Sequence, residues 1–142
     1  MRLKTTLLLF VFAILFSSCS ENDGPSQEIC SSWELVGFGN YHYYNEIPEG
    51  TEAYYTIAFH DNNTFSGTTS YHQYRGEYNL NKRIITIFNV ECNSTMEDES
   101  IVDEYNYIEC MGQINSYTVD GHTLVLHYGQ DKFGYYMKFK KK

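Results

Sequence analysis

The densest run of chemically versatile side chains is Tyr71-His72-Gln73-Tyr74-Arg75. In an extended strand, alternate residues point to opposite faces, so Tyr71, Gln73 and Arg75 would share one face. Tyrosine rings can stack on a ligand, and an arginine guanidinium offers several hydrogen-bond donors. Tyr71, His72, Tyr74 and Arg75 are therefore a candidate ligand face, although an ordinary strand with one solvated face explains the same pattern.

The histidines are the obvious candidates for proton transfer or metal binding. None stands four residues from another histidine or a carboxylate in a helical pattern, and the chain has no Gly-x-Ser-x-Gly motif. His60 and His122 adjoin expected turns, where an exposed polar residue is ordinary. The sequence therefore predicts no catalytic residue, no cofactor and no enzymatic activity. The histidines considered are His42, His60, His72, His122 and His127.

The cysteines offer a second kind of chemistry. Apart from Cys19, the chain has Cys30, Cys92 and Cys110, which allow at most one internal disulfide with one thiol left over. We favour Cys92 with Cys110, because a helix that returns over its preceding strand would bring them together, while Cys30 with Cys92 stays open. The lack of a Cys-x-x-Cys pair or a close Cys/His cluster predicts no metal site.

Acidic residues gather between 94 and 104, including Glu97, Asp98 and Glu99. They could bind a cation, but no Asp-x-Asp-x-Asp-Gly loop accompanies them. Carboxylates are also favoured near a helix N-terminus by the helix dipole. We therefore interpret the run as the beginning of a helix.

Most of the remaining chain predicts strands. Apolar residues alternate over 33–38, 53–60, 65–71, 77–80, 84–88, 117–119, 124–128 and 135–139. Turn residues separate them, among them Asp61-Asn62-Asn63-Thr64, Asn81-Lys82 and Asp120-Gly121. Residues 39–52 are expected to be a long polar connection, and Gly76 a turn or bulge.

One segment has a helical spacing instead. Ile101, Tyr105, Ile108 and Met111 recur at intervals of three and four, which predicts a helix over 101–112. The expected fold is mostly β (α+β): a single antiparallel, barrel-like domain of about eight strands with one helix inserted late. Residues 30–142 are long enough for one such domain and one core.

The N-terminus has the layout of an export signal. Arg2 and Lys4 precede the apolar run 7–16, which is too short to span a bilayer, since spanning needs roughly 20 apolar residues. Phe16-Ser17-Ser18-Cys19 is similar to a bacterial lipobox, apart from Phe where Leu is usual. Residues 1–18 are thus the expected signal peptide, and Cys19 the expected site of lipidation and membrane anchoring.

Residues 19–29 are expected to be a flexible tether, because their polar composition cannot bury apolar surface. The stretch Ser20-Glu21-Asn22-Asp23 is similar to the sorting signal of surface-exposed lipoproteins of Bacteroidetes. The expected location is the outer membrane, with cell-surface display left open. The formal net charge of −8 would become −10 once Arg2 and Lys4 are removed, which disfavours nucleic-acid partners.

A series of short motifs follows the same order as in a known family. The matching positions are Trp33, Leu35, Phe65, Ser66, Gly67, Gly76, Tyr78, Cys92, Glu104, Tyr107, Met111, Ile114, Tyr117, Gly121, Leu124 and Leu126. Together they resemble the META domain, the family that includes the heat-inducible outer-membrane lipoprotein HslJ. The resemblance covers most of residues 33–139.

The chain departs from that family at one motif, because Tyr71 and His72 stand where the family has the Cys and Asn of Gly-Cys-Asn. If the family cysteine pairs with the one matching Cys92, that bridge cannot form here. Lipocalin-like lipoproteins are a competing resemblance, but the helix expected over 101–112, so late and followed by two hairpins, favours the META domain.

The META resemblance implies a fold more than a mechanism, since the family has no agreed biochemical activity. We therefore expect a non-enzymatic envelope lipoprotein that contacts an unknown envelope or extracellular protein, in an accessory or stress role. The alternative is a lipocalin-like lipoprotein that binds a small molecule or glycan.

Overall fold

A computed structural model describes residues 28–48, 55–93, 102–130 and 134–142. The strands are β1 (Ser32–Gly39), β2 (Tyr44–Glu46), β3 (Thr56–Phe59), β4 (Thr64–Thr68), β5 (Gln73–Asn81), β6 (Ile84–Cys92), β7 (Ile114–Asp120), β8 (Thr123–Tyr128) and β9 (Tyr135–Lys141). The helix α1 (Val102–Met111) lies between β6 and β7. The export signal, Cys19 and the acidic residues 97–99 lie outside the described residues.

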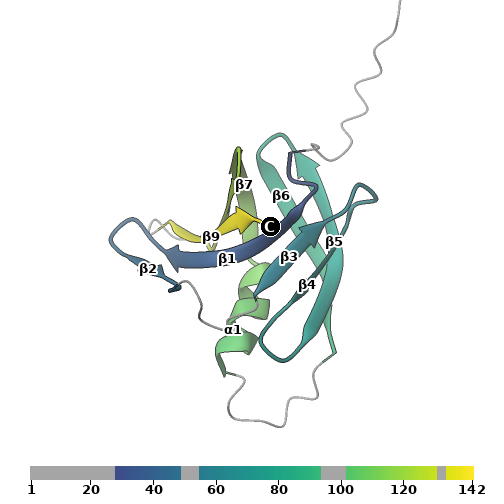
Figure 1. The fold of residues 1–142 in the computed structure, drawn as a ribbon. Coiled ribbons are helices and arrows are strands. Elements are labelled where there is room, and N and C mark those ends of the chain that lie inside the picture. The colour runs from purple at the N-terminus through teal and green to yellow at the C-terminus, as the bar shows by residue number, and fades with distance from the viewer. Residues whose placement is uncertain (1–27, 49–54, 94–101, 131–133) are drawn as a thin grey trace, which may run out of the picture.

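The strands form one antiparallel sheet that closes into a barrel (Figure 1). β1 and β3–β9 follow one another round the barrel, and β1 pairs with β9 from Trp33↔Lys141 to Gly39↔Tyr136. The expected mostly β, barrel-like fold with one late helix is confirmed. Closure gives β1 and β9 a neighbour on both sides, so neither is a free sheet edge that would invite pairing with another chain.

Most strand boundaries agree with the periodicity of the sequence, and the exceptions are instructive. The connection expected over 39–52 contains β2, a short strand that pairs with β1 from Gly37↔Glu46 to Gly39↔Tyr44. Gly76 lies inside β5, where the register shifts between Arg75 and Glu77, so it marks a bulge and not a turn. The expected turns at Lys82 and Gly121 are present, each with a positive φ.

The barrel interior is filled by side chains from every strand except β2, and by α1. Eight strands give an interior just wide enough for side chains to fill. Trp33 is fully buried and its indole Nε1 donates to the Ile29 carbonyl at 2.9 Å. The largest fully buried side chains are Trp33, Tyr78, Phe65, Phe139, Ile29, Ile57, Ile85, Met111, Leu124 and Leu126.

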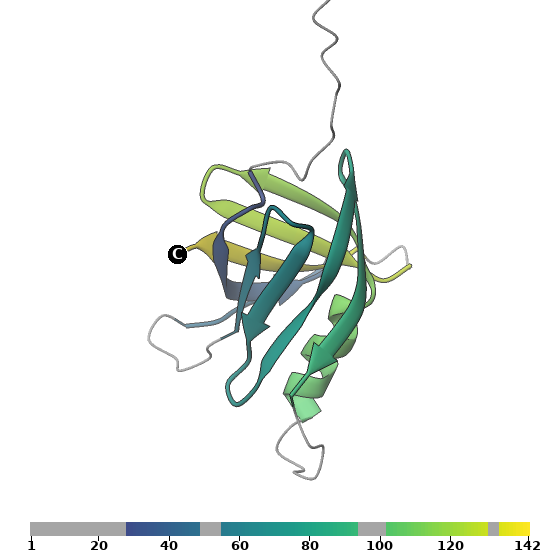
Figure 2. The same ribbon diagram turned by 90° about the vertical axis from the view of Figure 1, so that its right-hand side faces the viewer.

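The helix α1 lies at one end of the barrel, beside the end of β6 (Figures 1 and 2). The predicted helix is confirmed, and Met111 is buried as expected. Tyr107, which the three-and-four spacing leaves out, is also buried and packs edge-on against Tyr55 with ring centroids 4.8 Å apart. The helix therefore contributes an aromatic ring to the core and closes that end of the barrel.

The strand pairing is shortest between β6 and β7. Their ladder has the single register pair Ile84↔Ser116, supplemented by a hydrogen bond from Tyr117 N to the Arg83 carbonyl at 3.0 Å. The connection between these strands contains α1. The packing of the helix against the core thus supports the part of the barrel with fewest strand-to-strand hydrogen bonds.

No helix of the described residues is long and apolar enough to cross a membrane.

Candidate binding groove on the outer surface

The candidate ligand face of the sequence is divided by the fold. Tyr71 and His72 precede β5 in a turn, where the Thr69 hydroxyl accepts from His72 N at 3.0 Å. Tyr74 and Arg75 lie within β5 and point to opposite sides, because successive residues of a strand alternate. The four side chains therefore do not form one surface, and only Arg75 offers its charged end to solvent on the outer face of β5.

Tyr74 is a core residue with its hydroxyl in a hydrogen-bond network. Its Oη donates to the Thr56 carbonyl at 2.7 Å and lies 2.9 Å from Tyr107 Oη. Burial, with Tyr107 adding to the effect, raises the pKa of the Tyr74 phenol well above its ordinary value. The ring is not exposed for stacking on a ligand; it supports the sheet from beneath.

Gly67 makes this arrangement sterically feasible. A Cβ at Gly67 would overlap the Tyr74 ring and the Thr56 carbonyl oxygen, so no larger residue fits without displacing them. The Ser66-Gly67 pair, noted in the sequence as a family motif, therefore has a packing reason. It places the tyrosine directly under the outer face of β4.

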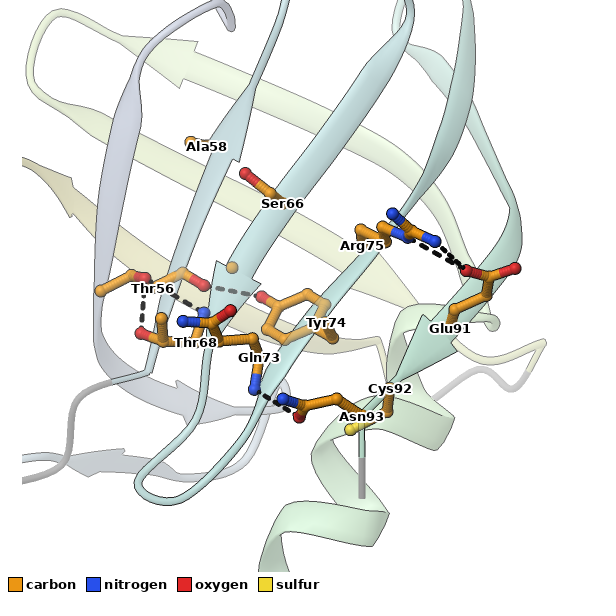
Figure 3. Close-up of a pocket in the computed structure, with 11 residues that line it drawn as sticks. Thr56, Ala58, Ser66, Thr68, Gln73, Tyr74, Arg75, Glu91, Cys92 and Asn93 are labelled. Atoms are coloured by element: carbon orange, nitrogen blue, oxygen red, sulfur yellow. Dashed lines mark hydrogen bonds and ion pairs between the residues drawn. The ribbon is translucent and has the colours of Figure 1, made fainter. Parts of the chain in front are cut away.

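Outside this point, β3, β4, β5 and β6 form a groove of about 630 Å³ on the outer surface (Figure 3). Small side chains from the first two strands form its floor, and longer polar side chains from the other two form its wall. The described residues that line it are Thr56, Ala58, Ser66, Gly67, Thr68, Gln73, Tyr74, Arg75, Glu91, Cys92 and Asn93.

Hydrogen bonds hold the groove residues in place. Thr56 and Thr68 face each other across β3 and β4 with their hydroxyl oxygens 2.8 Å apart. At the start of β5, Gln73 N donates to the Asn93 side-chain oxygen at 2.9 Å. The groove thus presents hydroxyl and amide groups that can both donate and accept hydrogen bonds.

One ion pair crosses the groove wall. Arg75 Nε and Nη2 donate to Glu91 Oε2 at 3.0 and 2.9 Å. The two side chains are 77% and 66% exposed, so water and salt screen the pair and its contribution to stability is small. Either charged group can therefore leave the ion pair and contact a charge on a ligand or partner, at little cost in free energy.

A hydroxyl and an imidazole also meet beside the groove. His60 Nε2 lies 3.0 Å from Ser66 Oγ, an arrangement that could activate a nucleophile if a third group oriented the histidine. Within the described part of the chain, no carboxylate hydrogen-bonds to His60, and the pair is exposed to solvent. The contact therefore gives no support for catalysis.

Three cysteines lie in different elements of the fold: before β1, at the end of β6 and in α1. Cys30, Cys92 and Cys110 are free thiols, so neither Cys92–Cys110 nor Cys30–Cys92 forms a disulfide in this structure. Cys30 Sγ lies 3.7 Å from Tyr78 Oη on β5. The Cys110 thiol neighbours the hydroxyl of Tyr128 on β8, and burial raises its pKa. The thiols of Cys30 and Cys110 thus neighbour different strands.

Sequence reasoning missed most of the groove. It identified Arg75 and placed Gln73 on the same face, but it did not connect them with Ser66, Thr68 or Glu91. The sequence did contain the information for the β3–β4 part, because the turn expected at 61–64 sets the register of that hairpin. This register pairs Ala58 with Ser66 and Thr56 with Thr68. The pairing of β5 with β6 past a bulge could not be read from periodicity.

The chain matches no protein-family model, and no curated protein is similar to it in sequence. Among solved structures, it is similar to a DUF4847 family protein from Bacteroides vulgatus ATCC 8482. The TM-score is 0.59 at 16% identity, over 80% of this chain and 94% of that one. A protein from Burkholderia xenovorans gives a TM-score of 0.62 at 16% identity, over 82% and 85%.

At this level of identity the two likenesses concern the fold alone. They show that the barrel architecture occurs in other solved proteins. Neither is described as a META domain, so that resemblance stays a prediction.

Proposed function

We propose that the protein is a non-enzymatic lipoprotein of the bacterial envelope, anchored through Cys19, whose barrel binds a protein partner through the groove of β3–β6. The observation that carries the binding part is the contrast between a filled interior and a groove on the outer surface whose side chains are held by hydrogen bonds. The anchoring part rests on the lipobox-like run that ends at Cys19.

Because the interior is filled, we place the binding site on the outer surface. Lipocalin-like barrels are compatible with this fold, but a ligand inside the barrel needs space. Here Trp33, Tyr78, Phe65 and Phe139 are among the fully buried side chains, and α1 closes one end. Space would have to be made by displacing well-packed side chains, which typically costs several kcal/mol.

The groove has the chemistry of a peptide contact. A polypeptide segment presents N–H donors and C=O acceptors in alternation, and the hydroxyls of Thr68 and Ser66 can satisfy either kind. Gln73 and Asn93 add amide groups, and the exposed Arg75–Glu91 pair can adapt to either sign of charge. A polar contact of this kind suits a reversible accessory role.

Photo-crosslinking in intact cells tests this proposal. A photoreactive amino acid in place of Ser66, on the groove floor, should give an adduct of discrete mass with one envelope protein. The same group in place of Lys82, in the exposed β5–β6 turn, should not. Arg75→Ala should reduce the Ser66 adduct. An adduct that forms equally from both positions, or none from Ser66, would refute the groove as a contact site.

The same cells test location. Protease added to intact cells should degrade a surface-displayed domain, whereas a domain that faces the periplasm is cleaved only after lysis. Rapid loss from intact cells would support the interpretation of Ser20 to Asp23 as a surface-export signal. Protection until lysis would refute it and would restrict the partner to periplasmic proteins.

A further inference from the structure

A second hollow, of about 680 Å³, is lined by other elements of the barrel. It is formed where β8 ends and β9 begins, beside the start of β7 and the loop between β1 and β2. None of its residues lines the groove of β3–β6. The described residues that line it are Tyr41, Asn115, Ser116, His127, Tyr128, Gly129, Gln130, Gly134 and Tyr135.

A hydrogen-bonded turn holds Tyr41 at the rim of this hollow. The Asn40 side chain is almost fully buried, and its Oδ1 accepts from the backbone N of His42 at 2.8 Å and of Tyr43 at 3.2 Å. Asn40 N in turn donates to the Tyr43 carbonyl at 2.9 Å. The turn thereby presents the Tyr41 side chain, 77% exposed, in a defined position.

Gly134 brings the Tyr41 ring close to the start of β9. A Cβ at Gly134 would overlap the Tyr41 ring, and the residue has a φ of 60° that favours glycine. The ring therefore lies directly on the backbone of Gly134. An exposed tyrosine seated in this way loses less side-chain entropy when it contacts a ligand than one on a free loop.

Two further aromatic rings, those of Tyr128 and Tyr135, line the hollow beside Tyr41. Tyr128 and Tyr135, which pair across β8 and β9, are stacked with centroids 5.7 Å apart and planes 22° apart. Burial and the neighbouring Cys110 thiol raise the pKa of Tyr128 to about 12, so its phenol is uncharged at neutral pH. The hollow thus has tyrosines on the rim and on the wall.

The polar side chains among the described lining residues are also uncharged. Asn115 Nδ2 donates to the Gly129 carbonyl at 2.7 Å, and its Oδ1 accepts from Ser116 Oγ at 3.1 Å. Burial lowers the pKa of His127, so its imidazole is neutral near pH 7 and can both donate and accept. Of the nine described lining residues, none carries a charge at neutral pH.

We propose that this hollow binds a sugar ring of a neutral glycan, independently of the groove. Tyrosine faces can stack on the C–H face of a sugar ring, while amide, hydroxyl and imidazole groups pair with its hydroxyls. The volume is within the range of small-molecule sites, which combine aromatic walls with a few polar groups. The net charge of −8 disfavours acidic sugars, and no described lining residue offers a charge to a cation.

The test is saturation-transfer NMR with the full lipoprotein in a detergent that contains no sugar. The probes are neutral trisaccharides of glucose, mannose, galactose and N-acetylglucosamine, with a trisaccharide of galacturonic acid as the anionic comparison. We expect at least one neutral trisaccharide to bind and the anionic one to give no signal. A signal for the anionic sugar alone, or for no sugar, overturns the proposal.

Two tyrosines of equal exposure provide a matched pair of variants. Tyr41→Ala should weaken binding about tenfold through loss of stacking, whereas Tyr41→Phe keeps the ring and should change it less than about threefold. Tyr71→Ala is the control, because Tyr71 is also 77% exposed but lines neither hollow. Equal weakening by Tyr71→Ala would show a nonspecific contact and overturn the site. The outcome does not depend on crosslinking from Ser66, so each proposal can fail alone.

Discussion

The buried hydroxyl network beneath the groove makes an asymmetric prediction. Tyr74 Oη donates to the Thr56 carbonyl, and a phenol has one proton, so the 2.9 Å contact with Tyr107 is donated by Tyr107. Tyr74→Phe therefore removes two hydrogen bonds and leaves the Tyr107 hydroxyl buried without its acceptor. Tyr107→Phe removes one hydrogen bond and leaves the other intact.

The expected loss in the free energy of unfolding follows from the hydrogen bonds that each variant removes. Tyr74→Phe should lower the free energy of unfolding by about 2–3 kcal/mol, because two hydrogen bonds are lost and one of them leaves the buried Tyr107 donor unsatisfied. Tyr107→Phe should lower it by about 1 kcal/mol. In the double variant the orphaned hydroxyl is absent, so its total cost should be close to that of Tyr74→Phe alone and clearly less than the sum.

Urea unfolding of the four proteins measures these values, with the fluorescence of the single tryptophan as the signal. Trp33 is fully buried in the native core, so its emission reports unfolding of the barrel. The midpoints and slopes give the coupling energy of the double-mutant cycle. Equal costs for the two single variants, or strict additivity, would refute the assigned direction of the hydrogen bonds.

Three further outcomes are expected. Gly67→Ala should lower the free energy of unfolding by about 1–3 kcal/mol through overlap with Tyr74, while Gly112→Ala, where a Cβ meets only an atom at 3.6 Å, should be nearly neutral in urea unfolding. The fold favours the neutral form of its buried phenols, and the pKa of Tyr128 is raised to about 12. This stabilisation is complete below pH 10 and is lost as the pH rises from 10 to 12. The urea midpoint should therefore fall over that range, and a constant midpoint would contradict this. Cys19→Ala should move the protein from the membrane to the soluble fraction, and unchanged membrane association would contradict lipid anchoring.

Local patterns were sufficient for the strands and the helix because each has its own periodicity. Alternation identified β1 and β8, and the three-and-four spacing that ends at Met111 identified α1. The short strand β2 was missed, since Tyr44–Glu46 is too short for a periodic signal and all three residues are exposed. Its pairing depends on β1, which no local pattern reveals.

The candidate site was predicted only in part for a similar reason. Strand alternation correctly separated Arg75 from Tyr74, but it could not decide which of the two faced the core. That decision came from Gly67 on the neighbouring strand, which leaves room for the Tyr74 ring. The sequence analysis also gave no weight to Tyr41, because its environment is made by Gly134, far along the chain.

The sequence by itself determined the type and order of the elements, and it predicts the export signal and the lipidated cysteine, because these depend on neighbours within a few residues. Only the tertiary structure decided that β1 pairs with β9, that the three described cysteines form no disulfide, and that two hollows lie on the surface. Those features arise from contacts between residues distant in the chain, whose geometry is set by barrel closure and by the space that each side chain leaves for the next.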